Sequence, residues 1–159
     1  MQNRERTLVL GIGNTLLTDE GIGIHVLNAL QQLDPGIENV EYMDGGTLSF
    51  TLAEPIQSCD NLIVIDASEI GRPPGSVETF ENESMDHFVT TGNKKSVHEV
   101  SLVDVLSMAL LSGSLPGRRA LLGIQPHSFD WGERPSRDVE NAIPEACDRV
   151  QELITKWQA

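Results

Sequence analysis

Cysteines and long apolar runs are scarce in this sequence. Its two cysteines, Cys59 and Cys147, are far apart and form no CxxC pair, which argues against a disulfide framework and against a structural zinc site. No stretch approaches the roughly 20 apolar residues of a membrane span. Gly11 interrupts the first apolar run too early for a signal peptide. The sequence therefore predicts a protein of the reducing cytoplasm with no membrane partner.

Basic residues are also few. The chain has 11 Lys and Arg residues against 24 Asp and Glu residues, for a formal net charge of -13. Like-charge repulsion excludes nucleic acid and anionic membrane surfaces as partners and favours a basic protein segment or a metal ion. The length of 159 residues predicts one domain over residues 1–159, since a chain of about 150 residues buries roughly 70% of its unfolded surface.

The segment TLVLGIGNTLLTDEGIG, residues 7–23, is typical of a buried strand, a tight turn and the start of a helix. A nucleotide-binding turn needs a third glycine where Leu16 stands, or a Lys-Ser/Thr pair after the turn, and neither is present. Asp19 and Glu20 place negative charge where a phosphate would bind. The turn therefore suits a cation better than an anion.

Apolar segments of two periodicities alternate along the chain. Strands are predicted at about residues 6–13, 40–44, 61–66, 76–80 and 119–125, with the one at 76–80 antiparallel to the others. Helices are predicted at about 22–33, 48–56, 96–111 and 136–157. This order predicts an α/β fold, a three-layer α/β/α sandwich around a mostly parallel, mixed sheet of about five strands.

Single residues add local expectations. Thr18 or Asp19 is expected to cap the first helix with its side-chain oxygen. Pro144 is expected to kink or divide the last helix, because an interior proline costs about 3 kcal/mol. The polar residues 81–97 are expected to form a mobile surface loop that orders over a substrate.

Ionisable residues lie where several of these elements meet. Glu20 follows the first strand, Asp66 ends the third, and His98 stands in the first turn of the helix that opens at Ser96. Because parallel strands end at the same edge of a sheet, these three side chains can converge. Two carboxylates and an imidazole suit a divalent ion such as nickel or zinc.

Each of these residues also has an ordinary interpretation. Glu20 would favour a helix dipole by about 0.3–1 kcal/mol, Asp66 would cap a turn, and His98 would simply begin a helix. Asp44, which precedes two glycines, is either a turn former or a catalytic carboxylate. A serine or cysteine nucleophile has no support, since the sequence has no GxSxG turn.

Five motifs taken together resemble the [NiFe]-hydrogenase maturation endopeptidases. They are GIGNTLLTDEGIG (residues 11–23), DGGT (44–47), IVIDA (63–67), HEVSLVDVL (98–106) and GIQP (123–126). The likeness covers nearly the whole chain, with the motifs in the family's order. This combination is far more specific than any single glycine-rich turn.

The resemblance implies a cytoplasmic endopeptidase with a hydrogenase large-subunit precursor as its partner. Such an enzyme removes a short carboxy-terminal extension after nickel has been inserted into the precursor. The family's metal-binding Glu, Asp and His correspond to Glu20, Asp66 and His98, all of the matching residue type. The family fold is also a twisted, mixed sheet of about five strands between helices.

The resemblance leaves the mechanism open. In one version the substrate presents its own nickel ion, and Glu20, Asp66 and His98 complete its coordination. Zinc or another divalent ion can take the place of nickel. In a second version the protein is a metallopeptidase with a resident zinc. Asp66 is the first candidate for the catalytic base and Asp44 the second. A nucleotide-binding domain and a nickel carrier without peptidase activity are the remaining hypotheses.

Overall fold

The computed structural model describes residues 5–33, 36–91 and 100–159, and in this part of the chain five strands form one sheet in the order β2-β1-β3-β5-β4. The neighbours β1, β2, β3 and β5 pair in parallel, whereas β4 runs antiparallel to β5. The predicted mixed sheet is therefore confirmed, including its antiparallel member. The strands are β1 (Thr7–Gly11), β2 (Val40–Asp44), β3 (Asn61–Ala67), β4 (Val77–Glu81) and β5 (Arg118–Ile124).

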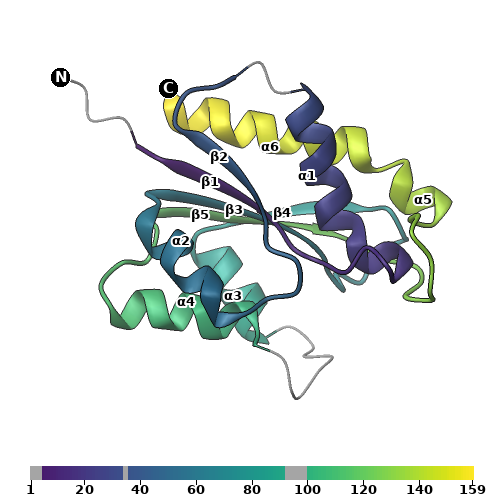
Figure 1. Cartoon of the computed structure of the whole chain (residues 1–159), viewed down its shortest axis with the longest axis horizontal. Helices are drawn as coiled ribbons and strands as arrows, with labels where there is room; N and C mark the ends of the chain where they lie inside the picture. The colour runs from purple at the N-terminus through teal and green to yellow at the C-terminus, as the bar shows by residue number, and fades with distance from the viewer. Residues whose placement is uncertain (1–4, 34–35, 92–99) are drawn as a thin grey trace.

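Helices cover both faces of this sheet, as the predicted sandwich requires. Figure 1 shows α1 and α6 over one face and α2, α3 and α4 over the other. The helical elements are η1 (Thr18–Gly21), α1 (Ile22–Leu33), η2 (Phe50–Leu52), α2 (Ala53–Ser58), α3 (Glu83–Thr91), α4 (Leu102–Leu111), α5 (Arg137–Glu140) and α6 (Ile143–Gln158).

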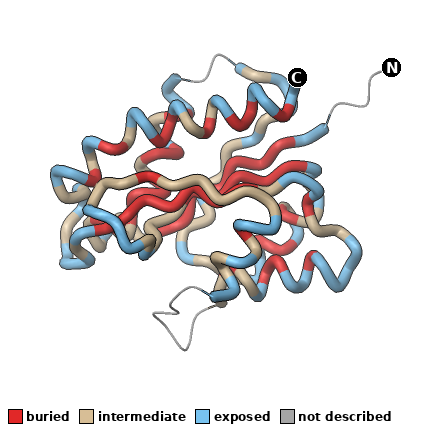
Figure 2. Tube along the Cα trace, turned by 180° about the vertical axis from the view of Figure 1, so that it is seen from behind, coloured by how far each residue is buried: buried red, intermediate tan, exposed pale blue. Residues whose placement is uncertain are grey.

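The apolar runs in the sequence follow from this double cover. Along β3, Ile63 and Ile65 pack toward α1 and α6, whereas Leu62 and Val64 pack toward α2 and α4. Successive side chains of a strand point to opposite faces, so a strand covered on both faces is apolar throughout. Figure 2 shows the result as a buried central sheet between helices whose outer sides are exposed.

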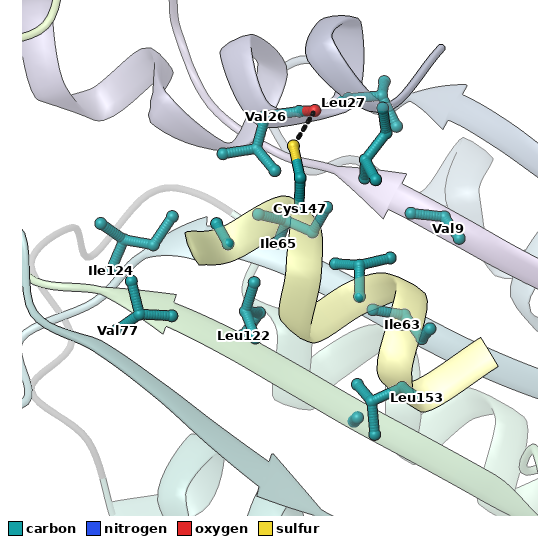
Figure 3. Packing of buried hydrophobic residues seen from close by; sticks show 14 of the residues in the cluster. Val9, Val26, Leu27, Ile63, Ile65, Val77, Leu122, Ile124, Cys147 and Leu153 are labelled. Carbon is teal, nitrogen blue, oxygen red and sulfur yellow. Dashed lines mark hydrogen bonds between the residues drawn. The ribbon is translucent and has the colours of Figure 1, made fainter. Parts of the chain in front are cut away.

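The two cysteines have free thiols. Cys147 packs in the core between α6 and α1, with its Sγ 4.0 Å from the carbonyl oxygen of Val26 (Figure 3), as expected for a small apolar side chain. Burial raises the pKa of the half-buried Cys59 to about 11, so its thiol carries little thiolate at neutral pH. Neither cysteine has the properties of a nucleophile.

The prediction of a loop at residues 81–97 is wrong for residues 83–91, which form helix α3. Met85 is fully buried, and Phe88 stacks on Phe80 of β4 with ring centroids 4.2 Å apart. Met85, Phe88 and Val89 recur at helical spacing and contact the core on the α4 side. The many polar residues between them form the exposed side of the helix. Residues 92–97 of the predicted loop lie outside the described residues.

Helix α4 begins later than the helix predicted from Ser96. Helix α4 starts at Leu102, and Ser101 precedes it as the N-cap, with its backbone N–H donating to Asp104 Oδ2 at 2.9 Å. This hydrogen bond between the N-cap residue and the third residue of the helix stabilises the first turn at that point in the chain. The predicted helix start at Ser96 and His98 is not tested, because both residues lie outside the described residues.

The chain divides near Pro144 as predicted, but without a kink. Helix α5 ends at Glu140, and α6 then begins at Ile143 with Pro144 in its first turn. A first-turn position suits proline, because its missing N–H would have no helical partner there. Among the helices of the described residues, none has the length and apolar character that crossing a bilayer requires.

Candidate functional site

The turn after β1 is packed against its own chain rather than open to a ligand. At Gly13, where φ is +147°, an added Cβ would overlap the carbonyl oxygen of Glu20. At Gly23 an added Cβ would overlap the carbonyl oxygens of Ile65 and Ile12. The glycines therefore let η1 and the start of α1 approach the ends of β1 and β3. Because backbone fills the space they leave, this turn does not form a phosphate cradle.

This close packing brings Glu20 beside the end of β3, where Asp66 is the second-last residue. Both side chains line a cavity of about 240 Å³ at the carboxyl ends of the parallel strands, the edge at which open α/β sheets bind ligands. A larger hollow of about 570 Å³ lies at the other end of β1, beside Arg6 and Thr7. Among the described residues, the others that line the smaller cavity are Ala67, Ser68, Glu69, Phe88, Val89, Ser101, Leu102, Val103, Leu121, Pro126 and Phe129.

The two carboxylates interact unfavourably when both are ionised. Burial raises the pKa of Asp66 well above its ordinary value, and the negative charge of Glu20 raises it further, against the lowering effect of a hydrogen bond with the backbone of Ala67. A proton on Asp66 or a cation between the two groups relieves this repulsion. Carboxylate oxygens are ligands for divalent ions, so the pair fits part of a metal-binding set.

His98, the third predicted ligand, lies outside the described residues. Within residues 5–33, 36–91 and 100–159, no three His, Cys, Asp or Glu side chains gather as a metal-binding group. The structure therefore brings Glu20 and Asp66 together, and the assignment of His98 stays a prediction.

Asp44 ends on the same edge of the sheet but apart from the pair. It is in register with Gly11, which is in register with Ile65, so Asp44 is two strands from β3, or about 10 Å. This register places Asp44 on the face of Ile65, whereas the next residue, Asp66, belongs to the opposite face. The Oδ1 atom of Asp44 accepts a hydrogen bond of 2.8 Å from the backbone of Gly46, as in a turn former.

Asp19 has a role that the sequence analysis missed. It does not cap α1. Instead its carboxylate is 0% exposed and accepts four hydrogen bonds from the segment before α5. The backbone N–H groups of His127 and Ser128 and the Oγ of Ser136 donate to Oδ2 at 2.8, 2.9 and 2.7 Å, and the backbone N–H of Ser136 donates to Oδ1 at 2.7 Å.

These bonds keep Asp19 ionised. Burial alone would raise its pKa, but the hydrogen bonds from Ser136, Ser128 and His127 outweigh that effect, and the pKa of Asp19 is below its ordinary value. The buried charge thereby fastens residues 127–136 to η1, directly beside Glu20. The sequence shows only that Asp19 and Glu20 are adjacent. It does not reveal that Asp19 binds a segment 108 positions away.

Glu69 is a second residue that the sequence analysis did not single out. Its carboxylate accepts a hydrogen bond of 3.0 Å from Gln125 Nε2, while Gln125 Oε1 accepts one of 2.8 Å from the backbone N–H of Ile70. Gln125 belongs to the GIQP motif and is buried. The motif thus fixes the loop after β3, which places a third carboxylate at the cavity.

Comparisons with known proteins agree on one kind of protein. The family model HycI, described as "Hydrogenase maturation protease", matches residues 24–153. The chain is 36% identical over 153 residues to "Hydrogenase expression/formation protein HupD" of Rhizobium leguminosarum bv. viciae, covering 96% of this chain and 75% of the relative. It is also 36% identical over 146 residues to "Hydrogenase 2 maturation protease" of Escherichia coli (strain K12), covering 91% of this chain and 88% of the relative.

A solved structure extends the likeness to three dimensions. The hydrogenase maturating endopeptidase HybD from E. coli superposes with a TM-score of 0.86 at 35% sequence identity, and the match covers 95% of this chain and 93% of that one. The nucleotide-binding hypothesis has no counterpart in these similarities.

Proposed function

This chain belongs to the hydrogenase maturation proteases, and we propose that it removes a short carboxy-terminal peptide from the nickel-loaded precursor of a [NiFe]-hydrogenase large subunit. The observation that carries this proposal is the Glu20–Asp66 pair, which lines a cavity at the carboxyl ends of the sheet strands in a protein of a protease family.

In this proposal the nickel ion is part of the substrate. Glu20 and Asp66 bind it through their carboxylate oxygens, and His98 completes the set with its imidazole. Such a mixed oxygen and nitrogen set suits a divalent ion of borderline softness, and zinc can take its place. A precursor without nickel offers no cation to offset the repulsion between Glu20 and Asp66.

Asp66 is the favoured proton acceptor for the hydrolysis step. It lines the cavity, and a carboxylate there can take a proton from an attacking water molecule. A bound nickel ion supplies the electrophile that polarises a carbonyl or acidifies a water molecule. Asp44 is the second candidate, but it lies two strands away and bonds its own turn.

The test is a processing reaction followed by mass spectrometry. Purified protein is incubated with nickel-loaded precursor and, separately, with nickel-free precursor, and the mass of the large subunit is measured. We expect loss of a terminal peptide from the loaded precursor alone. Asp66→Asn should abolish this loss, whereas Asp148→Asn, which changes an exposed carboxylate on α6, should process normally.

Two results would contradict the proposal. An unchanged mass of the loaded precursor would reject the peptidase and leave a nickel carrier. Equal cleavage of both precursors, together with one equivalent of zinc in the purified protein, would favour a resident metallopeptidase instead.

A further inference from the structure

Three exposed apolar side chains lie on the two segments that flank the cavity. Leu16 precedes η1 and is 50% exposed, while Phe129 and Trp131 precede α5 and are 38% and 81% exposed. Phe129 also lines the cavity that contains Glu20 and Asp66. We call Leu16, Phe129 and Trp131 the apolar strip.

The backbone holds the two sides of the strip together. Leu17 and Gly132 form a parallel bridge, in which the N–H of Gly132 donates to the carbonyl of Leu16 at 2.9 Å and the N–H of Thr18 donates to the carbonyl of Gly132 at 2.8 Å. These bonds bring the backbone of Leu16 next to that of Trp131.

Hydrogen bonds with η1 also hold the segment that carries Phe129 and Trp131. The buried carboxylate of Asp19 binds the backbone at positions 127, 128 and 136, on both sides of Phe129 and Trp131. In addition, Thr18 Oγ1 donates to the carbonyl of Ser128 at 2.7 Å. A surface that is ordered before binding loses less conformational entropy when it binds, which favours affinity.

We infer that the apolar strip is a docking surface for the folded body of the large-subunit precursor, separate from the residues that bind nickel; this inference rests on the proposed function. Its continuity with the cavity puts a protein bound there in reach of Glu20 and Asp66. Exposed tryptophan and phenylalanine are the residue types that dominate binding energy in protein interfaces.

The charge of the chain defines the occupant further. Asp130 and Glu133 lie exposed beside the strip, as do Arg137 and Arg134, and Arg134 pairs with Glu140 at 3.3 Å. The chain as a whole has a net charge of -13. The complementary surface on the precursor is therefore an apolar patch with Lys or Arg residues around it. Other exposed apolar residues, such as Leu110 and Leu111 at the end of α4, lie away from the cavity lining.

The test compares Trp131→Ala with Leu111→Ala. Both residues are highly exposed, at 81% and 87%, so neither change should affect folding. Leu111 is a matched control because it ends α4, about 13.5 Å along the helix axis from Leu102 at the cavity. Affinity for nickel-loaded precursor is measured by calorimetry, and kcat and KM by the processing reaction.

We expect Trp131→Ala to weaken precursor binding and raise KM by about tenfold or more, with kcat nearly unchanged, and Leu111→Ala to match the wild type. Equal affinities for the two variants, or a wild type that does not bind the precursor, would overturn the inference. If the wild type binds the precursor but cleaves nothing, the proposed function fails, while a selective loss of affinity in Trp131→Ala still supports the docking surface.

Discussion

Replacing Asp19 by asparagine should destabilise the fold strongly, although the two side chains have nearly the same volume. Asp19 accepts three hydrogen bonds at Oδ2 and one at Oδ1, and all four donors come from the segment before α5. An asparagine that keeps its oxygen at the Oδ2 position turns its NH₂ group toward the backbone N–H of Ser136. Two donors then face each other in a site with no access to water.

The magnitude follows from these contacts. Loss of the Ser136 bond costs about 1.5–3 kcal/mol, the usual value for a hydrogen bond to a charged group. The other three bonds lose their charge assistance, which roughly doubles the strength of a hydrogen bond, at about 0.5–1 kcal/mol each. The free energy of unfolding should therefore fall by about 3–6 kcal/mol. For a chain of this size that lowers the Tm by about 6–24 °C.

The assay is urea unfolding of wild type and Asp19→Asn at several pH values. The native pKa of Asp19 is lowered from 3.8, so the unfolded state binds the proton more tightly and stability falls as pH drops through the native pKa. The gap between wild type and Asp19→Asn should thus be full at neutral pH and shrink in acid.

Asp130→Asn is the matched control, because Asp130 is an exposed carboxylate on the same segment and accepts a bond of 3.1 Å from Ser128 Oγ. It should change stability by less than about 0.5 kcal/mol. If Asp19→Asn unfolds at the same urea concentration as this control, the buried carboxylate does not hold the segment, and the reasoning fails.

Three further substitutions test other parts of the structure. Gly23→Ala should destabilise by about 1–3 kcal/mol or more in thermal unfolding, because its Cβ meets backbone on two sides, whereas Gly117→Ala, in open space, should be nearly neutral. Met85→Ala should cost about 2–5 kcal/mol if α3 packs as described, and an unchanged Tm would reject that helix's place in the core. Asp66→Asn should abolish processing but raise the free energy of unfolding. This gain in stability should grow as pH rises from the ordinary carboxyl pKa toward the raised pKa of Asp66, because ionising Asp66 destabilises the native state of the wild type. A urea titration in which this gain does not grow with pH would contradict the raised pKa of Asp66, which burial and the charge of Glu20 cause together.

The sheet was predictable because its signal is local and strong. The β3 run from Leu62 to Ile65 is apolar at every position, and a strand of that kind is buried on both faces wherever it lies. Helix α3 was missed because Met85, Phe88 and Val89 are its few buried or half-buried apolar contacts, and polar residues surround them. A weak helical stripe among polar residues looks the same in sequence as a loop.

The site was predictable only where strand ends determine it. The ends of β1 and β3 had to meet at one edge, and Glu20 and Asp66 do meet there. Asp44 also ends a strand at this edge, but its register with Gly11 and Ile65 places it on the opposite face of the sheet from Asp66. The contacts of Asp19 with residues 127–136 join segments over 100 positions apart, and no periodicity reports such contacts.

Asp19 and Asp66 show how neighbouring groups modify the effect of burial on the charge of a carboxylate in this protein. Burial raises the pKa of both, but hydrogen-bond donors around Asp19 reverse the effect, whereas the charge of Glu20 adds to it at Asp66. Asp19 is therefore satisfied within the chain and serves to hold the site together. The repulsion between Glu20 and Asp66 is relieved by a proton on Asp66 or by a cation. Under the proposed function, the cation on a loaded precursor relieves it, which favours a loaded precursor over an empty one.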